Sequence, residues 1–256
     1  MARIIGIINA KGGVGKTTSV LSLGSFLAAK GKYVLIVDLD PQANATSGLG
    51  VRLGDDHVNL YHTLVADTEP EAIIKKTSLF GLDLLPSAPS LAGANVELVE
   101  TEEREFSLKK ALDRIRTNYD YVLIDSPPSL GLLTINGLVA AEQVIIPVQC
   151  EYYALEGLTQ LFKTIDMVRA SLNPRLQILG VLLTMYDKRN KLANEVVAEV
   201  KKNFPGRVFE TVIPRVVSLA EAPGFGKTIL QFDPKSKGAE AYQTLAEEIL
   251  KLAARC

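Results

Sequence analysis

The chain has 256 residues, 47% hydrophobic and 22% charged, so it can bury a sizeable core, and we expect one α/β domain over residues 1–256. A formal net charge of -1 excludes a chain that is basic throughout, so any nucleic-acid contact must come from a local patch. No basic leader, membrane-length apolar run, disulfide framework or metal-ligand cysteine spacing is found, which predicts a cytoplasmic protein.

Short runs rich in Val, Ile and Leu, without polar alternation, are typical of strands buried on both faces. They occur at residues 3–8, 33–38, 82–86, 121–125, 143–148, 176–183 and 208–213. Segments of helical period lie between or after them, at residues 18–30, 106–117, 155–171, 192–204 and 239–254. This alternation predicts a mostly parallel sheet flanked by helices on both faces, in which ligands bind beyond the carboxyl ends of the strands.

The first predicted strand runs directly into a glycine-rich segment that opens the first helix. It reads Lys11-Gly12-Gly13-Val14-Gly15-Lys16-Thr17-Thr18, a P-loop of deviant Walker type in which Ala10 replaces the first glycine of the usual pattern. The glycines let backbone N–H groups turn toward phosphate oxygens, Lys16 is placed to reach the β- and γ-phosphates, and the Thr17 hydroxyl to ligate Mg²⁺. A turn with a solvated lysine is the alternative, but the order of strand, glycines, Lys-Thr and helix predicts ATP binding and hydrolysis.

Two later strands end in acidic residues. In a parallel sheet, ligands bind at the carboxyl ends of the strands, which is where these residues lie. Asp38 and Asp40 stand two residues apart: Asp40 can orient or deprotonate the attacking water, and Asp38 can hold Mg²⁺-bound water or the loop. Capping of nearby N–H groups is the alternative for both. Asp125 follows four apolar residues, the Walker B arrangement that binds Mg²⁺ directly or through water.

Together these segments resemble the ParA/Soj family of chromosome- and plasmid-partitioning ATPases, which is similar to MinD in fold. The resemblance covers almost the whole chain and is carried by residues 11–18, 38–50, 125–128, 183–189 and 213–215. It implies an ATP-dependent sandwich homodimer in which Lys11 reaches the partner's phosphates. A cation arriving from the second subunit would neutralise charge on the transferring phosphoryl group, as an arginine finger does. A solvent-facing loop lysine is the alternative for Lys11.

The resemblance also implies that Pro214 and Arg215 lie near the adenine, and that ATP-bound dimers bind duplex DNA without sequence preference on the nucleoid. Arg189 falls at the family's DNA-contacting arginine, and Lys188 and Lys191 add local charge. A solvated loop is the alternative for this cluster. Ser218 stands where the family pattern has a second basic residue. The implied partner is a ParB-like centromere-binding protein, with the cargo left open.

Other functional classes use the same scaffold. A MinD-like membrane-cycling ATPase needs a basic amphipathic C-terminal helix, but residues 240–256 carry three glutamates against Lys251 and Arg255, so we expect no membrane partner. An iron–sulfur reductase needs two cluster cysteines, a pattern that Cys150 and Cys256 do not match. A ligase with a small-substrate pocket stays open.

Overall fold

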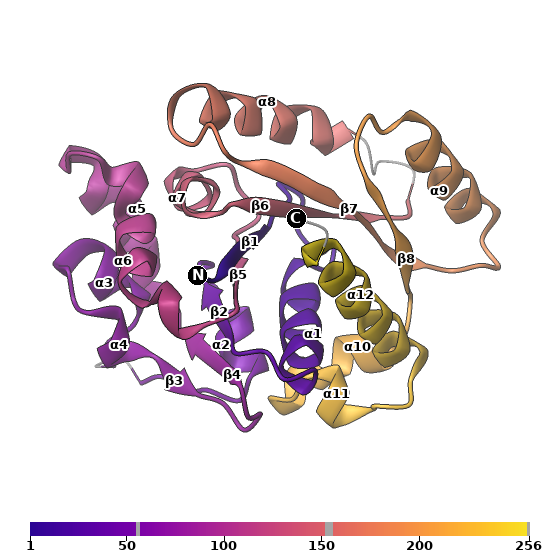
Figure 1. Cartoon of the computed structure of the whole chain (residues 1–256), viewed down its shortest axis with the longest axis horizontal. Coiled ribbons are helices and arrows are strands. Elements are labelled where there is room, and N and C mark those ends of the chain that lie inside the picture. The colour runs from indigo at the N-terminus through magenta and orange to yellow at the C-terminus, as the bar shows by residue number, and fades with distance from the viewer. Residues whose placement is uncertain (55–56, 152–155, 255–256) are drawn as a thin grey trace.

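A central sheet of eight strands organises the computed structural model, which describes residues 1–54, 57–151 and 156–254 (Figure 1). The strand order is β3-β4-β2-β5-β1-β6-β7-β8, and all neighbours are parallel except the edge pair β3 and β4. The strands are β1 (Arg3–Ile7), β2 (Val34–Asp38), β3 (Lys75–Lys76), β4 (Leu82–Leu85), β5 (Tyr121–Asp125), β6 (Gln143–Gln149), β7 (Gln177–Tyr186) and β8 (Val208–Pro214). The predicted mostly parallel sheet is confirmed.

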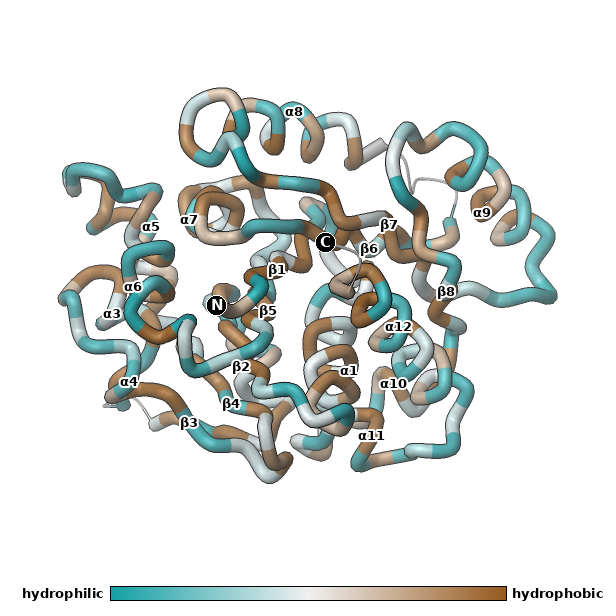
Figure 2. Tube along the Cα trace, in the orientation of Figure 1, coloured by the Kyte–Doolittle hydropathy of each residue, from teal (hydrophilic) through white to brown (hydrophobic). Residues whose placement is uncertain are grey.

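Helices cover both faces of this sheet (Figure 1). One face packs against α1 (Lys16–Ala29), α2 (Asn44–Gly48), α10 (Val217–Glu221), α11 (Ile229–Phe232) and α12 (Lys237–Ala253). The other packs against α3 (Leu60–Ala66), α4 (Pro70–Ile73), α5 (Ala94–Glu97), α6 (Ser107–Ile115), α7 (Leu132–Ala140), α8 (Glu156–Ser171) and α9 (Lys191–Asn203). Along β5, Tyr121 and Leu123 join the first core and Val122 and Ile124 the second, which explains why the central strands are apolar without alternation (Figure 2).

The predicted elements are present, with ends that differ by a few residues. The first helix begins at Lys16 rather than Thr18, and the strand expected to end at Leu183 continues to Tyr186. Leu155, the first residue of one predicted helix, lies outside the described residues. Helix α7 was not predicted, because its sequence is apolar on nearly all sides and shows no helical period. The single domain expected over residues 1–256 stays a prediction.

The last helix packs its apolar side against the protein rather than presenting it to solvent. Tyr242, Leu245 and Ile249 of α12 are buried in the core shared with α1. No helix among the described residues combines the length and the apolar character that crossing a membrane requires.

The edge strand β8 departs from the register of its neighbour β7. Val181 pairs with Val208 and Leu183 with Val212, so three residues of β8 lie opposite one residue of β7. Extra residues in one strand form a bulge, which leaves backbone groups without partners in the ladder.

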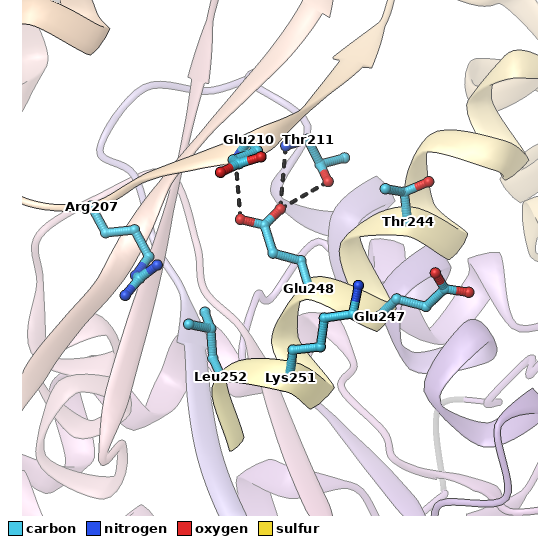
Figure 3. Close-up of a pocket in the computed structure, with 8 residues that line it drawn as sticks. All are labelled: Arg207, Glu210, Thr211, Thr244, Glu247, Glu248, Lys251 and Leu252. Atoms are coloured by element: carbon cyan, nitrogen blue, oxygen red, sulfur yellow. Dashed lines mark hydrogen bonds between the residues drawn. The ribbon is translucent and has the colours of Figure 1, made fainter. Parts of the chain in front are cut away.

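A carboxylate from α12 takes up these groups (Figure 3). Glu248 accepts hydrogen bonds from the backbone N–H groups of Glu210 and Thr211, at 3.0 and 3.2 Å, and from the Thr211 hydroxyl at 2.9 Å. Thr211 is 7% exposed. Glu248 therefore replaces the missing strand partners and fastens α12 to the edge of the sheet.

We expect Glu248→Ala to lower the free energy of unfolding by about 1–3 kcal/mol, because two backbone donors lose their acceptor. Urea unfolding followed by circular dichroism measures this change. The matched control is Glu247→Ala, one residue earlier. Glu247 is 44% exposed and forms an ion pair with Lys30. That control should change stability by no more than about 0.5 kcal/mol. Equal losses in the two variants would contradict the role given to Glu248.

Candidate active site

The glycine-rich loop between β1 and α1 adopts a conformation that depends on two of its glycines. Gly13 and Gly15 have φ angles of 73° and 90°, in the left-handed region that residues with a Cβ rarely adopt. Gly15 directly precedes α1, and no side chain caps the N-terminus of this helix. The backbone N–H groups of the first turn of α1 are therefore available to an anion. The loop is therefore shaped to bind phosphate.

Two buried polar side chains that were not predicted from the sequence form hydrogen bonds with the backbone of this loop. Asn9 accepts a hydrogen bond from the Lys11 N–H at 3.0 Å and donates to the Pro147 carbonyl at 2.7 Å. Thr184 donates to the Val14 carbonyl at 2.9 Å. The one signal in the sequence is a polar residue, Asn9, directly after an apolar strand.

The two lysines of the loop lie in different surroundings. Lys16 is 7% exposed, and its ammonium group donates to the Lys11 carbonyl at 3.0 Å. Burial lowers the pKa of Lys16, and the nearby charges of Asp125 and Asp40 oppose this shift. The Lys11 side chain is exposed. One cation thus lies at the base of the loop, and the other faces outward.

Asp38 and Asp125 are paired in register at the ends of β2 and β5, and both are completely buried. Asp38 accepts three hydrogen bonds: from the Thr46 N–H and hydroxyl, both at 2.7 Å, and from the Asp40 N–H at 3.2 Å. Burial raises the pKa of Asp38 to about 6 although these bonds oppose the shift. Two of these contacts are of the kind that the capping alternative describes, since the backbone N–H groups of Asp40 and Thr46 donate to Asp38. A contact of Asp38 with Mg²⁺-bound water stays a prediction.

The Asp125 carboxylate differs from its neighbour, since neither oxygen has a hydrogen-bond partner among the described residues. Burial raises the pKa of Asp125 well above its usual range, and the charge of Asp38 adds to the shift. The adjacent Thr17 hydroxyl and the Lys16 ammonium group lower the pKa of Asp125, but the Thr17 hydroxyl does not form a full hydrogen bond with this carboxylate. A buried carboxylate that lacks a partner, beside a threonine hydroxyl, fits a hydrated Mg²⁺ ion, which prefers oxygen ligands and keeps several waters.

The loop opens into a cavity of about 480 Å³ that also contains Asp40. One oxygen of Asp40 accepts from the Gln42 N–H at 2.9 Å, and its backbone carbonyl accepts from the Ser87 hydroxyl at 2.7 Å. Asp40 is thus held in place at the wall of the cavity. The cavity also has lining residues that were not predicted: Asn44, Ser47, Pro128, Met185, Pro223 and Gly224.

A second cavity, of about 160 Å³, adjoins the first and shares Gly15, Thr18 and Met185 with it. Pro214 and Arg215, the residues expected near the adenine, line this cavity together with apolar residues of β8 and α10. Met185, between the two cavities, has a φ angle of 53°, which is unusual for a residue with a side chain. The two cavities together offer a polar site and a more apolar site side by side.

The predicted DNA-contacting residues lie on the surface, outside both cavities. Arg189 is 85% exposed, and its guanidinium donates two hydrogen bonds to Asp187, at 3.0 and 2.9 Å. Lys188 is exposed, and Lys191 lies 3.8 Å from Glu195. The basic cluster is therefore accessible, but acidic neighbours offset part of its charge.

The Ser218 side chain cannot supply the second surface contact of the family pattern. Ser218 lies in α10, is 9% exposed, and its hydroxyl has no partner among the described residues.

We expect Asp125→Asn to raise the free energy of unfolding by about 1–3 kcal/mol in EDTA without nucleotide, because it removes a buried carboxylate that lacks a partner. The folded pKa exceeds the unfolded one, so ionisation costs stability as the pH rises between them. The gain should therefore grow from about pH 4 upward and vanish below it.

Asp38→Asn is the matched control, since it changes an equally buried carboxylate that has three donors. Below about pH 4, where the carboxyl group is protonated, it should lower stability by about 1–3 kcal/mol, because the amide nitrogen cannot accept from these donors. Part of this loss should disappear as the pH rises toward 6, since the pKa of Asp38 is also raised. Urea unfolding across the pH range measures both variants, and a loss of stability in Asp125→Asn would contradict this account of the site.

Comparison with known proteins gives concordant matches over nearly the full length. Residues 2–178 match a family model described as an AAA domain. The sporulation initiation inhibitor protein Soj of Bacillus subtilis is 55% identical over 97% of this chain and 98% of that protein, and the chromosome partitioning protein ParA of Myxococcus xanthus is 50% identical over 98% and 89%.

Among solved structures, one named cobyrinic acid a,c-diamide synthase from Mycobacterium smegmatis, with bound ADP and magnesium, is 40% identical. It superposes with a TM-score of 0.87 over 98% of this chain and 95% of that one. On the strength of these matches, the chain belongs to the ParA/Soj family of partitioning ATPases.

Proposed function

We propose that this chain hydrolyses ATP with Mg²⁺ in an ATP-dependent homodimer, that the dimer binds duplex DNA without sequence preference, and that it segregates a chromosome or plasmid with a ParB-like partner. The contrast between the two loop lysines carries the proposal. Lys16 is buried at the base of its own site, whereas Lys11 is exposed. One cation serves the phosphates of its own subunit, and the other is available to the second subunit.

The proposal gives the remaining residues the following roles. Lys16 and the loop N–H groups bind the phosphates, and Asp40, fixed by the Gln42 N–H, orients the attacking water. Thr17 and Asp125 would hold Mg²⁺, which neutralises charge on the phosphates when bound. The smaller cavity beside Pro214 and Arg215 suits the base.

In this proposal ATP controls DNA binding through dimerisation, because the dimer carries two copies of the basic surface. Arg189, Lys188 and Lys191 form a small cluster whose charge is partly offset, so one copy binds phosphates weakly. Joining two copies gives the second contact an effective concentration on the order of mM. The proposal places the protein in the cytoplasm, and on the nucleoid when ATP is bound.

Two competing classes are separated by the same measurement. The packed α12 does not favour a membrane-cycling role, because its apolar side is already buried. The similarity to a structure named as an amide synthase favours a small-substrate ligase as the second candidate. Retention of the ATP-bound protein on DNA supports partitioning, retention on lipid vesicles supports membrane cycling, and retention on neither supports the ligase.

We expect Asp40→Ala to bind ATP, to lower kcat about 10²–10⁴-fold, and to accumulate as a dimer, because only the positioning of water is lost. Lys11→Ala should bind ATP and remain without a productive dimer, and Lys16→Ala should lose ATP binding while staying folded. Light scattering and single-turnover hydrolysis measure these outcomes.

Mixing provides the sharpest control of this prediction. In a mixed dimer, the Lys11→Ala subunit keeps Asp40 and receives Lys11 from an Asp40→Ala subunit, so turnover should return at one of the two sites. Absence of turnover at every mixing ratio, or an ATP-bound Asp40→Ala that stays monomeric, would overturn the proposed action of Lys11 across the dimer.

We expect Arg189→Glu to abolish DNA retention of dimers trapped by Asp40→Ala, while ATP-dependent dimerisation stays intact. Each phosphate contact removed should lower the slope of log affinity against log salt by about 1. Arg207→Glu is the matched control, because Arg207 is also basic and exposed but lies just before β8, in a cavity lined by residues of β8 and α12 (Figure 3). Unchanged DNA affinity in Arg189→Glu, measured by titration across a salt series, would place the DNA surface elsewhere.

A further inference from the structure

The loop between β7 and α9 holds Arg189 on an ordered backbone (Figure 1). A turn closes this loop, since the Asn190 N–H donates to the Asp187 carbonyl at 3.0 Å, and the Asn190 side chain caps the N-terminus of α9. Asn194 of α9 donates to the Lys188 carbonyl at 3.2 Å. The backbone on both sides of Arg189 is therefore fixed by hydrogen bonds.

The Asp187 carboxylate accepts three hydrogen bonds from Arg189. One oxygen accepts from the Arg189 backbone N–H and from Nε, both at 3.0 Å, and the other accepts from Nη2 at 2.9 Å. The hydrogen bonds from the Arg189 side chain, and next the one from its N–H, lower the pKa of Asp187 to about 2, so this carboxylate is negatively charged at neutral pH. One edge of the guanidinium that could bind two phosphate oxygens is thus occupied by a carboxylate of the same chain.

This ion pair offsets much of the positive charge of the exposed basic cluster. Lys188, Arg189 and Lys191 carry a formal charge of +3, which falls to +1 when Asp187 and Glu195 are included. The contact between Lys191 and Glu195 is long, at 3.8 Å, and both side chains are largely exposed. Asp187, in contrast, binds Arg189 through both of its oxygens. Asp187 is therefore the carboxylate that lowers the affinity of this cluster for phosphate most.

Arg189 can exchange Asp187 for another anion, because a second cation acts on this carboxylate. The positive charge of Arg215 also contributes to the lowered pKa of Asp187. Arg215 is held beside the loop by its N–H, which donates to the Tyr186 carbonyl at 2.9 Å, and its guanidinium pairs with Glu151 at 3.0 Å. Arg189 is 85% exposed, so a DNA phosphate can reach it. Replacing one exposed anion by another brings little net free energy, and a single copy of the cluster gains little from DNA.

We propose that Asp187 makes DNA binding depend on the dimer, because its carboxylate competes with DNA phosphates for Arg189. One copy of the cluster then binds DNA too weakly to be retained. Two copies in the ATP-bound dimer are retained, because the second contact forms at a high effective concentration. This inference rests on the proposed function, which assigns the DNA contact to Arg189, and it adds the residue that keeps the monomer off DNA.

Asp187→Asn tests this inference, because the amide oxygen can still accept from the Arg189 N–H and keep the turn, whereas the negative charge is removed. The measurement is fluorescence anisotropy of a labelled duplex of mixed sequence, titrated with the full-length protein at low salt. Without nucleotide, we expect the variant to bind about 3–10-fold more tightly than the unchanged chain, with a salt slope steeper by about 1. In dimers trapped with ATP by Asp40→Ala both copies gain, so the improvement should approach the square of that factor, about 10–100-fold.

Two controls separate this effect from general charge attraction. Glu199→Gln removes an exposed negative charge about two turns beyond Lys191 on α9, and it should change DNA affinity by less than about twofold. Adding Arg189→Gln to Asp187→Asn should abolish the gain, because the competition needs Arg189. Asp187→Ser repeats the test with a shorter acceptor, and an unchanged far-UV spectrum and ATP-dependent dimerisation verify folding.

Three outcomes would overturn the inference. The first is a nucleotide-free Asp187→Asn that binds DNA no more tightly than the unchanged chain. The second is an equal gain in Glu199→Gln, and the third is a gain that persists when Arg189→Gln is added. The proposed function is tested separately by Arg189→Glu in the trapped dimer. If Arg189→Glu weakens DNA binding while Asp187→Asn brings no gain, the DNA contact stands and only the role given to Asp187 is wrong.

Discussion

The site depends on a carboxylate that is buried with no hydrogen-bond partner among the described residues. Asp125 ends the strand next to β1, directly under the loop that carries Lys16. Its neighbour Asp38 is equally buried but accepts hydrogen bonds from Thr46, which order the loop after β2. Asp125 is therefore the carboxylate of the pair that can interact with a cation. Mg²⁺ and the phosphates, if they bind together, would offset the cost of burying the charges of Asp125 and Lys16 in a medium of low dielectric constant.

The sequence was sufficient for those parts of the structure that are determined locally. The apolar runs, the glycine loop and the strand-end carboxylates are each contained in a few consecutive residues, and the sheet and the P-loop followed from them. It was insufficient where the partner is distant in the chain. Thr184 supports Val14 from 170 residues away, and Glu248 serves a bulge that appears only in the pairing of β7 with β8. Asp38 shows a smaller gap, because capping of nearby N–H groups was an expected alternative for this carboxylate, but its partner Thr46, eight residues away, was not identified.

The fold alone does not distinguish a partitioning ATPase from an enzyme that acts on a small substrate. A protein named as an amide synthase shares this scaffold at 40% identity, so the architecture does not separate partitioning from small-substrate chemistry. Under the proposed function, the exposed Lys11 bears on this question. It would have a use at a face where two subunits meet around nucleotide, and none in a closed pocket for a small substrate.

The capped bulge of β8 also limits how copies of this chain can associate. An open strand edge is a template for joining the sheet of one molecule to that of another, and it leads to uncontrolled polymers. Here Glu248 occupies two backbone donors of β8, those of Glu210 and Thr211, and the opposite edge is β3, two residues long and made of Lys75 and Lys76. Edges of this kind disfavour strand addition, which leaves helix and loop surfaces for contacts with other molecules.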